Sequence, residues 1–201
     1  AKLRRDLNHS RQIGFPRKVV NTGESIDLII FCDASKEMYG CSFYVLNELG
    51  ECGLMFAKAK VAPVKTKTLP TLELLALFLG FQCLDSVVDS LKDVNIKSIQ
   101  FGVDSQIVLS WVLSEKIKTK NVFARNRIAD ISKLRRLILD ERGIDCKFHY
   151  IQSSLNPADL LTRGLTIDQF NSNHEFWFHG PEFLHSTNVS WPIAPLNCLS
   201  E

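Results

Sequence analysis

Leu28-Ile29-Ile30-Phe31-Cys32 is a short, continuous apolar run that ends at Asp33. A run without polar alternation is typical of a β-strand that is buried on both faces. Two β-rich runs follow at 40–45 and 53–61, and the turn residues Asn47-Glu48-Leu49-Gly50 separate them. The three runs together predict an antiparallel meander.

Helices and strands alternate beyond the meander. Pro70 lies where a helix can begin, and the apolar residues that follow it cover nearly the whole circumference, which predicts a helix buried between layers. Further patterns predict a strand at 96–103, helices at 105–113 and about 124–142, a strand at 146–151, and a helix at 156–163. The order β-β-β-α-β-α-α-β-α predicts an α/β fold with a five-stranded mixed sheet flanked by helices.

The composition is that of an ordinary globular domain with extensions. The 201 residues are 45% hydrophobic and 23% charged, with a net charge of +2, which argues against disorder and against a strongly basic nucleic-acid-binding tail. We expect a basic lead-in or linker at 1–27, the domain proper at 28–164, and an extension at 165–201 that packs on it. The chain starts without Met or an apolar signal core, so we expect it to be cut from something longer.

The six cysteines form no C-x-x-C pair, which argues against a structural zinc site. The chain is too long and too apolar to need a disulfide framework, so we interpret the cysteines as free thiols in a reducing compartment. This predicts an intracellular protein, cytoplasmic or alternatively nuclear. No apolar run approaches the roughly 18 residues of a membrane span, so we expect no membrane partner.

Four carboxylates stand at the ends of predicted elements. Asp33 follows the first strand and Asp104 the fourth, and ligand sites in α/β sheets lie beyond strand ends. Glu73 lies in the most apolar helix of the chain, where an unpaired carboxylate is costly to bury. Asp159 is expected as the third residue of a helix that starts at Pro157. The four acids are therefore candidates for one cluster.

Each acid also has an ordinary structural interpretation. Asp33 and Asp104 fit turns or helix N-caps. Glu73 and Asp159 fit first helical turns, where the helix dipole favours an anion. As a cluster, however, the four carboxylates would repel one another without cations. Hard oxygen ligands suit Mg²⁺ or Mn²⁺, and two such ions about 3.5–4 Å apart are the standard arrangement for in-line attack on a phosphodiester.

Four ordered motifs and part of the tail resemble the ribonuclease H domain of BEL/Pao-type retroelement polyproteins. The resemblance covers about residues 28–192. The residues that carry it are Phe31-Cys32-Asp33-Ala34-Ser35, Leu69-Pro70-Thr71-Leu72-Glu73-Leu74-Leu75-Ala76, Asp104-Ser105-Gln106-Ile107-Val108-Leu109-Ser110-Trp111, Asn156-Pro157-Ala158-Asp159-Leu160-Leu161-Thr162-Arg163-Gly164, Trp177-Phe178-His179-Gly180-Pro181-Glu182-Phe183-Leu184 and Trp191-Pro192.

The resemblance implies an RNase H-like fold and endonucleolytic hydrolysis of the RNA strand of RNA/DNA hybrids, which leaves 3′-hydroxyl and 5′-phosphate ends. It implies two Mg²⁺ ions, which Mn²⁺ can replace. Asp33 would bridge both ions, Asp159 would complete the site on the side of the attacking water, and Glu73 and Asp104 would complete the other. The partners implied are the RNA/DNA hybrid and an upstream reverse transcriptase domain of the same polyprotein, with a virus-like particle as the setting.

Substrate contacts are expected at Ser35 and, by the match of Asp104-Ser105-Gln106 to retroviral ribonucleases H, at Ser105 and Gln106. A second group of expected contacts is basic: Lys116, Lys118 and Lys120 lie in a loop where some ribonucleases H grip the hybrid. A solvated loop is the alternative interpretation of these lysines, and Lys58, Lys60, Lys65 and Lys67 are then the candidates for the grip.

Two departures from the family pattern bear on mechanism. The loop at 152–156 has no histidine, although many ribonucleases H carry one before the last Asp. His149 is expected inside the fifth strand and hence in a structural role. Pro70 stands where retroviral enzymes have a polar amide, so Thr68 or Thr71 would have to read the RNA 2′-hydroxyl.

Three other functions are open on sequence grounds. The first is a catalytically inactive module of the same fold that binds nucleic acid or braces a polymerase. The second is an aspartic protease, which would need Gly at the position of Ser35. The third is an integrase-like transferase with Glu141 as its last acid, which leaves Glu73 and Asp159 without a role.

Overall fold

The computed structural model describes residues 20–21, 23–64, 68–114, 119–185 and 191–192. One mixed sheet is built in the order β3-β2-β1-β4-β5, with antiparallel pairs β1/β2 and β2/β3 and parallel pairs β1/β4 and β4/β5. The order of elements confirms the expected α/β fold with a five-stranded mixed sheet. The strands are β1 (Ser25–Ala34), β2 (Met38–Asn47), β3 (Cys52–Val61), β4 (Asn95–Val103) and β5 (Cys146–Tyr150).

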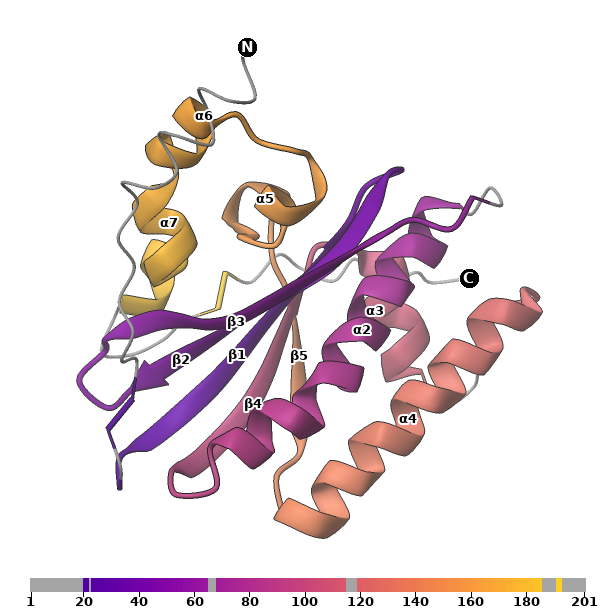
Figure 1. Ribbon diagram of the computed structural model, residues 1–201. Helices are drawn as coiled ribbons and strands as arrows, with labels where there is room; N and C mark the ends of the chain where they lie inside the picture. Colours follow the sequence, from indigo (N-terminus) through magenta and orange to yellow (C-terminus); the bar gives the residue numbers. More distant parts are fainter. Residues whose placement is uncertain (1–19, 22, 65–67, 115–118, 186–190, 193–201) are drawn as a thin grey trace.

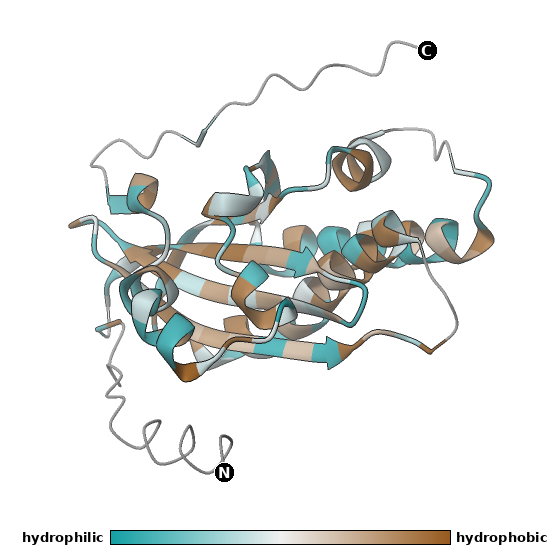
Figure 2. Cartoon of the chain, turned by 90° about the horizontal axis from the view of Figure 1, so that it is seen from above, coloured by the Kyte–Doolittle hydropathy of each residue, from teal (hydrophilic) through white to brown (hydrophobic). Residues whose placement is uncertain are grey.

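Helices cover both faces of this sheet. The long helices α2 and α4 lie on one side, together with α3, and the short helices α5, α6 and α7 lie on the other (Figure 1). Viewed from above, the strands between these layers are largely hydrophobic (Figure 2). The helices are α2 (Leu69–Ser90), α3 (Gln106–Leu113), α4 (Val122–Arg142), α5 (Asp159–Thr162), α6 (Ile167–Ser172) and α7 (His174–His179), with 3-10 turns at Ser153–Leu155 and Glu182–His185.

The central strand β1 is buried on both faces, as its apolar run predicts. All residues from 28 to 34 are buried. Alternate side chains, such as Leu28 and Ile30, join the large cluster under α2 and α4, whereas Ile29 and Phe31 join a smaller cluster on the opposite face. The strand also begins earlier than the apolar run, at Ser25, because pairing with β4 extends to that residue.

The tail forms two short helices that the sequence pattern did not indicate. Its contacts reach the second face of the sheet: the Tyr44 hydroxyl donates to the Trp177 carbonyl at 2.7 Å, and Trp191 Nε1 donates to Gln100 Oε1 at 2.7 Å. The Trp191 ring also stacks on His149, with ring centroids 4.1 Å apart and planes at 5°. These contacts close the smaller of the two hydrophobic clusters.

Helix α2 corrects the expectation that no apolar segment approaches the length of a membrane span. It is long and apolar enough, by length and composition alone, to cross a membrane, with a mean hydropathy of 1.6 over an 18-residue window. However, 72% of that window is buried inside the domain. The helix packs against β1, β2 and α4, which accounts for apolar residues on nearly all of its sides.

Gly102 on β4 gives a direct test of the packing between the sheet and the tail. A Cβ atom there would lie 2.7 Å from Phe31 Cδ1 and 3.1 Å from Trp191 Cζ3. We expect Gly102→Ala to lower the free energy of unfolding by about 1–3 kcal/mol, because two packed rings would have to shift. Urea denaturation measures this, with the exposed Lys97→Ala on the same strand as control. Equal stability of the two variants would contradict the described packing.

Candidate active site

The carboxyl edge of the sheet brings the first two candidate acids together. Asp33 lies near the end of β1 and Asp104 directly follows β4. These two strands are parallel neighbours, with Cys32 opposite Val103, so the two acids leave the sheet side by side. Glu73 lies one turn into α2, and Asp159 is the first residue of α5.

The pKa shifts show that the acids act on one another. Burial raises the pKa of Asp33 to about 6, and the negative charges of Asp104 and Asp159 act in the same direction. Burial likewise raises the pKa of Asp104, with a further contribution from Asp159. The pKa of Glu73 is raised by burial and by the charge of Asp104. The four predicted acids therefore form one electrostatically coupled cluster.

Neighbouring hydroxyl groups hold three of the carboxylates. Thr162 Oγ1 donates to Asp33 Oδ2, and Ser105 Oγ donates to Glu73 Oε2 at 2.5 Å. Ser153 Oγ donates to Asp104 Oδ2, also at 2.5 Å. Each of these bonds favours the ionised form and so opposes the effect of burial on the pKa.

A guanidinium group holds the fourth carboxylate. Arg163 Nε donates to Asp159 Oδ1 at 2.5 Å, one helical turn along the chain. The same positive charge lowers the pKa of Asp33 and of Asp104. Arg163 thus acts as an internal counter-ion for three of the four acids.

Asn156 fixes the loop that carries Asp159. Its Nδ2 donates to the Cys32 carbonyl at 2.9 Å, one residue before Asp33, and its Oδ1 accepts from the Ala158 amide at 3.1 Å. The helix itself begins at Asp159 and not, as expected, at Pro157, because a 3-10 turn and the Asn156 bonds occupy the preceding residues. Asn156 is therefore an anchor between this loop and β1.

The chemistry of these donors fits a divalent cation, although their present arrangement is not that of a coordination shell. Among the described residues, no group of three or more His, Cys, Asp or Glu side chains is placed to hold a metal ion. Each carboxylate is instead turned toward its hydroxyl or guanidinium partner. Within the part of the chain that the structure describes, however, Asp104 Oδ1 is buried without a hydrogen-bond partner, which is costly for a carboxylate oxygen. A hard cation would satisfy this atom and neutralise the cluster.

The predicted substrate contacts have different surroundings. Ser35 donates to the Thr162 carbonyl at 2.8 Å and accepts from the Glu37 and Met38 amides, so it shapes the β1–β2 turn. Ser105 caps α3 in addition to holding Glu73. Gln106 is the first residue of α3 and is partly exposed. Of the three loop lysines, Lys120 is exposed before α4, whereas Lys116 and Lys118 lie outside the described residues, as do Lys65 and Lys67.

The structure also places His149, which was expected in a structural role, and the two threonines that were candidates for reading the RNA 2′-hydroxyl. His149 lies in β5, as predicted, and burial lowers its pKa to about 4. Its ring is stacked on Trp191, which supports a structural role. Thr71 is buried and its hydroxyl lies 2.8 Å from that of Thr68. Of the two threonines, only Thr68 is exposed.

Asp33 should make the metal-free domain less stable as the pH rises. Its pKa in the folded state, about 6, exceeds the ordinary value of 3.8, so stability from this group is lost as the pH rises from about 4 to 6. We expect Asp33→Asn to raise the free energy of unfolding at pH 7 in EDTA by about 1–3 kcal/mol. Denaturant unfolding between pH 4 and 7 measures the effect, with Asp27→Asn on the same strand as control. A variant no more stable than wild type would refute the described burial.

Removal of the Arg163 charge should change the titration of the cluster. We expect Arg163→Gln to raise the pKa of Asp33 and Asp104, because a cation that favours their ionised forms is lost. Carboxyl ¹³C chemical shifts measured across a pH series in EDTA give both values. Arg163→Lys should restore part of the shift, and Arg125→Gln, an exposed change on α4, should leave both values as in wild type. Unmoved titrations in Arg163→Gln would contradict the counter-ion role.

Several solved structures are similar to this chain, and the one with a TM-score of 0.50 supports the RNase H-like fold. LC11-RNase H1, solved in complex with an RNA/DNA hybrid, is 15% identical over 73% of this chain and 99% of its own, with a TM-score of 0.50. RNase H1 from Halobacterium salinarum is 11% identical over 74% and 98% of the two chains, with a TM-score of 0.48. A protease-reverse transcriptase of prototype foamy virus is 13% identical over 70% of this chain and 19% of its own, with a TM-score of 0.42.

No curated protein matches the chain in sequence. The model of one protein family does match, over residues 1–105. This match includes Asp33, Glu73 and Asp104. In the structure these acids lie in one electrostatically coupled cluster with Asp159, at one edge of an RNase H-like sheet. Since the match spans more than half of the 201 residues, the chain belongs to the Pao retrotransposon-like RNaseH-like domain family.

Proposed function

We propose that this domain is an active, metal-dependent ribonuclease H that hydrolyses the RNA strand of RNA/DNA hybrids during retroelement reverse transcription. The observation that carries the proposal is the coupled set of four buried or half-buried carboxylates at the carboxyl edge of the sheet. Such a set lowers the stability of a metal-free domain, which is a common feature of sites selected for function.

In this proposal the four acids would hold two Mg²⁺ or Mn²⁺ ions: Asp33 would serve both, Asp159 would serve one, and Glu73 and Asp104 would serve the other. Two such ions supply the positive charge that in-line hydrolysis of a phosphodiester requires. The chain supplies hydrogen bonds that favour the ionised carboxylates: Thr162 donates to Asp33 and Ser153 donates to Asp104.

The family membership supports the setting of this proposal. We infer that the domain acts on the hybrid made by a reverse transcriptase domain of the same polyprotein, inside the cell, in the cytoplasm or in a virus-like particle. The competing function is an inactive module that binds nucleic acid. Such a module would not need four coupled and partly desolvated acids.

Hydrolysis of a labelled RNA/DNA hybrid tests the proposal. We expect wild type to cleave the RNA strand in Mg²⁺ or Mn²⁺ and not in EDTA, and to leave RNA/RNA and DNA/DNA duplexes intact. Asp33→Asn should lower the rate by about 10³-fold or more while binding the hybrid in Ca²⁺ as wild type does, because a charged ligand is lost from a folded site. Asp27→Asn, outside the cluster, should keep full activity. Binding without cleavage by wild type would favour the inactive module.

Asp159 gives a second test of the proposal, at the acid that is assigned to one ion only. Asp159→Asn should lower metal-dependent cleavage by orders of magnitude and leave hybrid affinity in Ca²⁺ nearly unchanged. Steady-state rates and filter binding give the two quantities. Loss of binding with retained cleavage would reverse the role assigned to this residue.

The loop lysines are proposed to hold the phosphates of the hybrid. Substitution of Lys116, Lys118 and Lys120 by Ala should reduce the slope of log K against log salt by about two to three, since each phosphate contact contributes roughly −0.7 to −0.9. KM should rise and kcat should change little. A control that removes the same charge from the exposed Lys92, Lys97 and Lys147 should keep the slope. An unchanged slope in the loop variant would contradict this assignment and leave other lysines as the phosphate contacts.

A further inference from the structure

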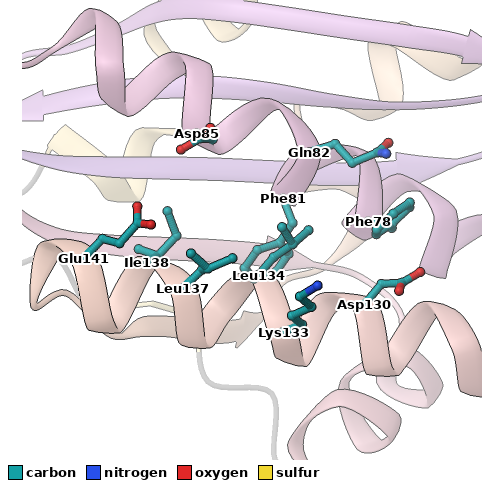
Figure 3. Close-up of a pocket in the computed structure, with 10 residues that line it drawn as sticks. All are labelled: Phe78, Phe81, Gln82, Asp85, Asp130, Lys133, Leu134, Leu137, Ile138 and Glu141. Carbon is teal, nitrogen blue, oxygen red and sulfur yellow. The ribbon is translucent and has the colours of Figure 1, made fainter.

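The outer surface of the helical layer contains an apolar groove that the carboxylate cluster does not use. It lies between α2 and α4, has a volume of about 590 Å³, and is drawn in Figure 3. Phe81 of α2 and Ile138 of α4, which are only 2% and 5% exposed, form its base, and Leu134 of α4 is partly exposed beside them. Leu137, at the groove, is 40% exposed although it is a large apolar side chain. The groove therefore offers apolar surface that folding of the domain leaves partly uncovered.

The charge of the groove is negative at one end. Asp85 from α2 and Glu141 from α4 lie on its two sides near that end (Figure 3), and neither has an ion-pair partner among the residues that the structure describes. The neighbouring Arg142 is paired with Asp89. Lys133, the one lysine of the lining, lies toward the other end, beside Asp130 (Figure 3).

The direction of the two helices adds to this negative charge. Arg127 of α4 lies over the Phe78 ring at 4.8 Å, and Arg142 pairs with Asp89, so positions along α2 and α4 increase together. The helices are thus parallel. The C-terminus of α4, one residue beyond Glu141, adds a partial negative charge near that side chain, whereas α2 continues beyond Asp85 to Ser90.

We propose that this groove binds an amphipathic helical segment of another protein, with apolar anchors on Leu137 and its neighbours and a Lys or Arg between Asp85 and Glu141. The lined part of α2, from Phe78 to Asp85, is about 10 Å long at 1.5 Å per residue, which suits two helical turns and anchors at i, i+3 or i+4, and i+7. A nucleic acid does not fit, because its phosphates would meet unpaired carboxylates. The inference is independent of the proposed nuclease activity.

Peptide selection identifies the occupant. The probe is a displayed library of random 16-residue helical peptides, selected on the wild-type chain and counter-selected on Leu137→Ser. We expect the enriched sequences to combine Leu, Ile or Phe at helical spacing with Lys or Arg at one end. Enrichment of acidic sequences, or of none that depends on Leu137, would overturn the proposal.

The affinity of one selected peptide, measured by fluorescence anisotropy, tests the anchor. Leu137→Ser should raise Kd about tenfold or more, as is typical of a truncated apolar anchor. Leu139→Ser is the matched control: this leucine is 43% exposed on the same helix, but it lines a different hollow, with Val112 and Phe148. Because both side chains are exposed, both variants should fold, which circular dichroism checks. Equal effects of the two would overturn the proposal.

The charge at the end of the groove is tested in the same way. Asp85→Asn combined with Glu141→Gln should weaken the basic peptide about fivefold and flatten its salt dependence. Asp140→Asn, an exposed acid next to Glu141 that does not line the groove, should change neither. Sedimentation of the wild-type chain tests whether a second copy of the chain fills the groove. Self-association that Leu137→Ser abolishes would show that it does, and would overturn the proposal of another protein.

Discussion

Asp33 lies on the central strand β1, of which all residues from 28 to 34 are buried, and is itself only 4% exposed. A charged group in this position is costly unless it is paired and hydrogen-bonded. The surrounding elements meet that requirement. Thr162 of α5 donates to the carboxylate, Arg163 lowers its pKa, and Asn156 ties the intervening loop to β1. The position of α5 on the sheet thus follows from the need to satisfy one buried acid.

The same arrangement explains why the site is a source of instability. Three acids with raised pKa values lie within electrostatic reach of one another, and their hydroxyl partners offset the burial only in part. Asp104 Oδ1, which has no hydrogen-bond partner among the described residues, adds a second unfavourable feature. A domain selected for stability alone would replace these groups by apolar ones, whereas a cation-binding nuclease needs them. The large cluster under α2 and α4 compensates by burying apolar side chains.

Much of this architecture could be predicted from local sequence patterns. The run from Leu28 to Cys32 has no polar alternation, and it does form a strand covered on both faces. The four acids were recognisable because they follow or begin predicted elements. The hydrogen-bond partners of these acids could not be recognised in the same way, because they are distant in sequence. Ser153 lies 49 residues from Asp104, and Thr162 lies 129 residues from Asp33. Helices α6 and α7 have six residues each, too few for a periodic pattern to show, and tertiary contacts of the tail define them.

The central claim is that Asp33, Glu73, Asp104 and Asp159 act together to bind the two proposed divalent ions. A titration with Mg²⁺, followed by the carboxyl ¹³C chemical shifts of all acidic side chains, tests it most directly. The account predicts that all four resonances move as Mg²⁺ is added, while that of Asp27, on the same strand as Asp33, stays in place. Shifts confined to a single acid, or a shift of Asp27 as large as those of the four acids, would contradict the account.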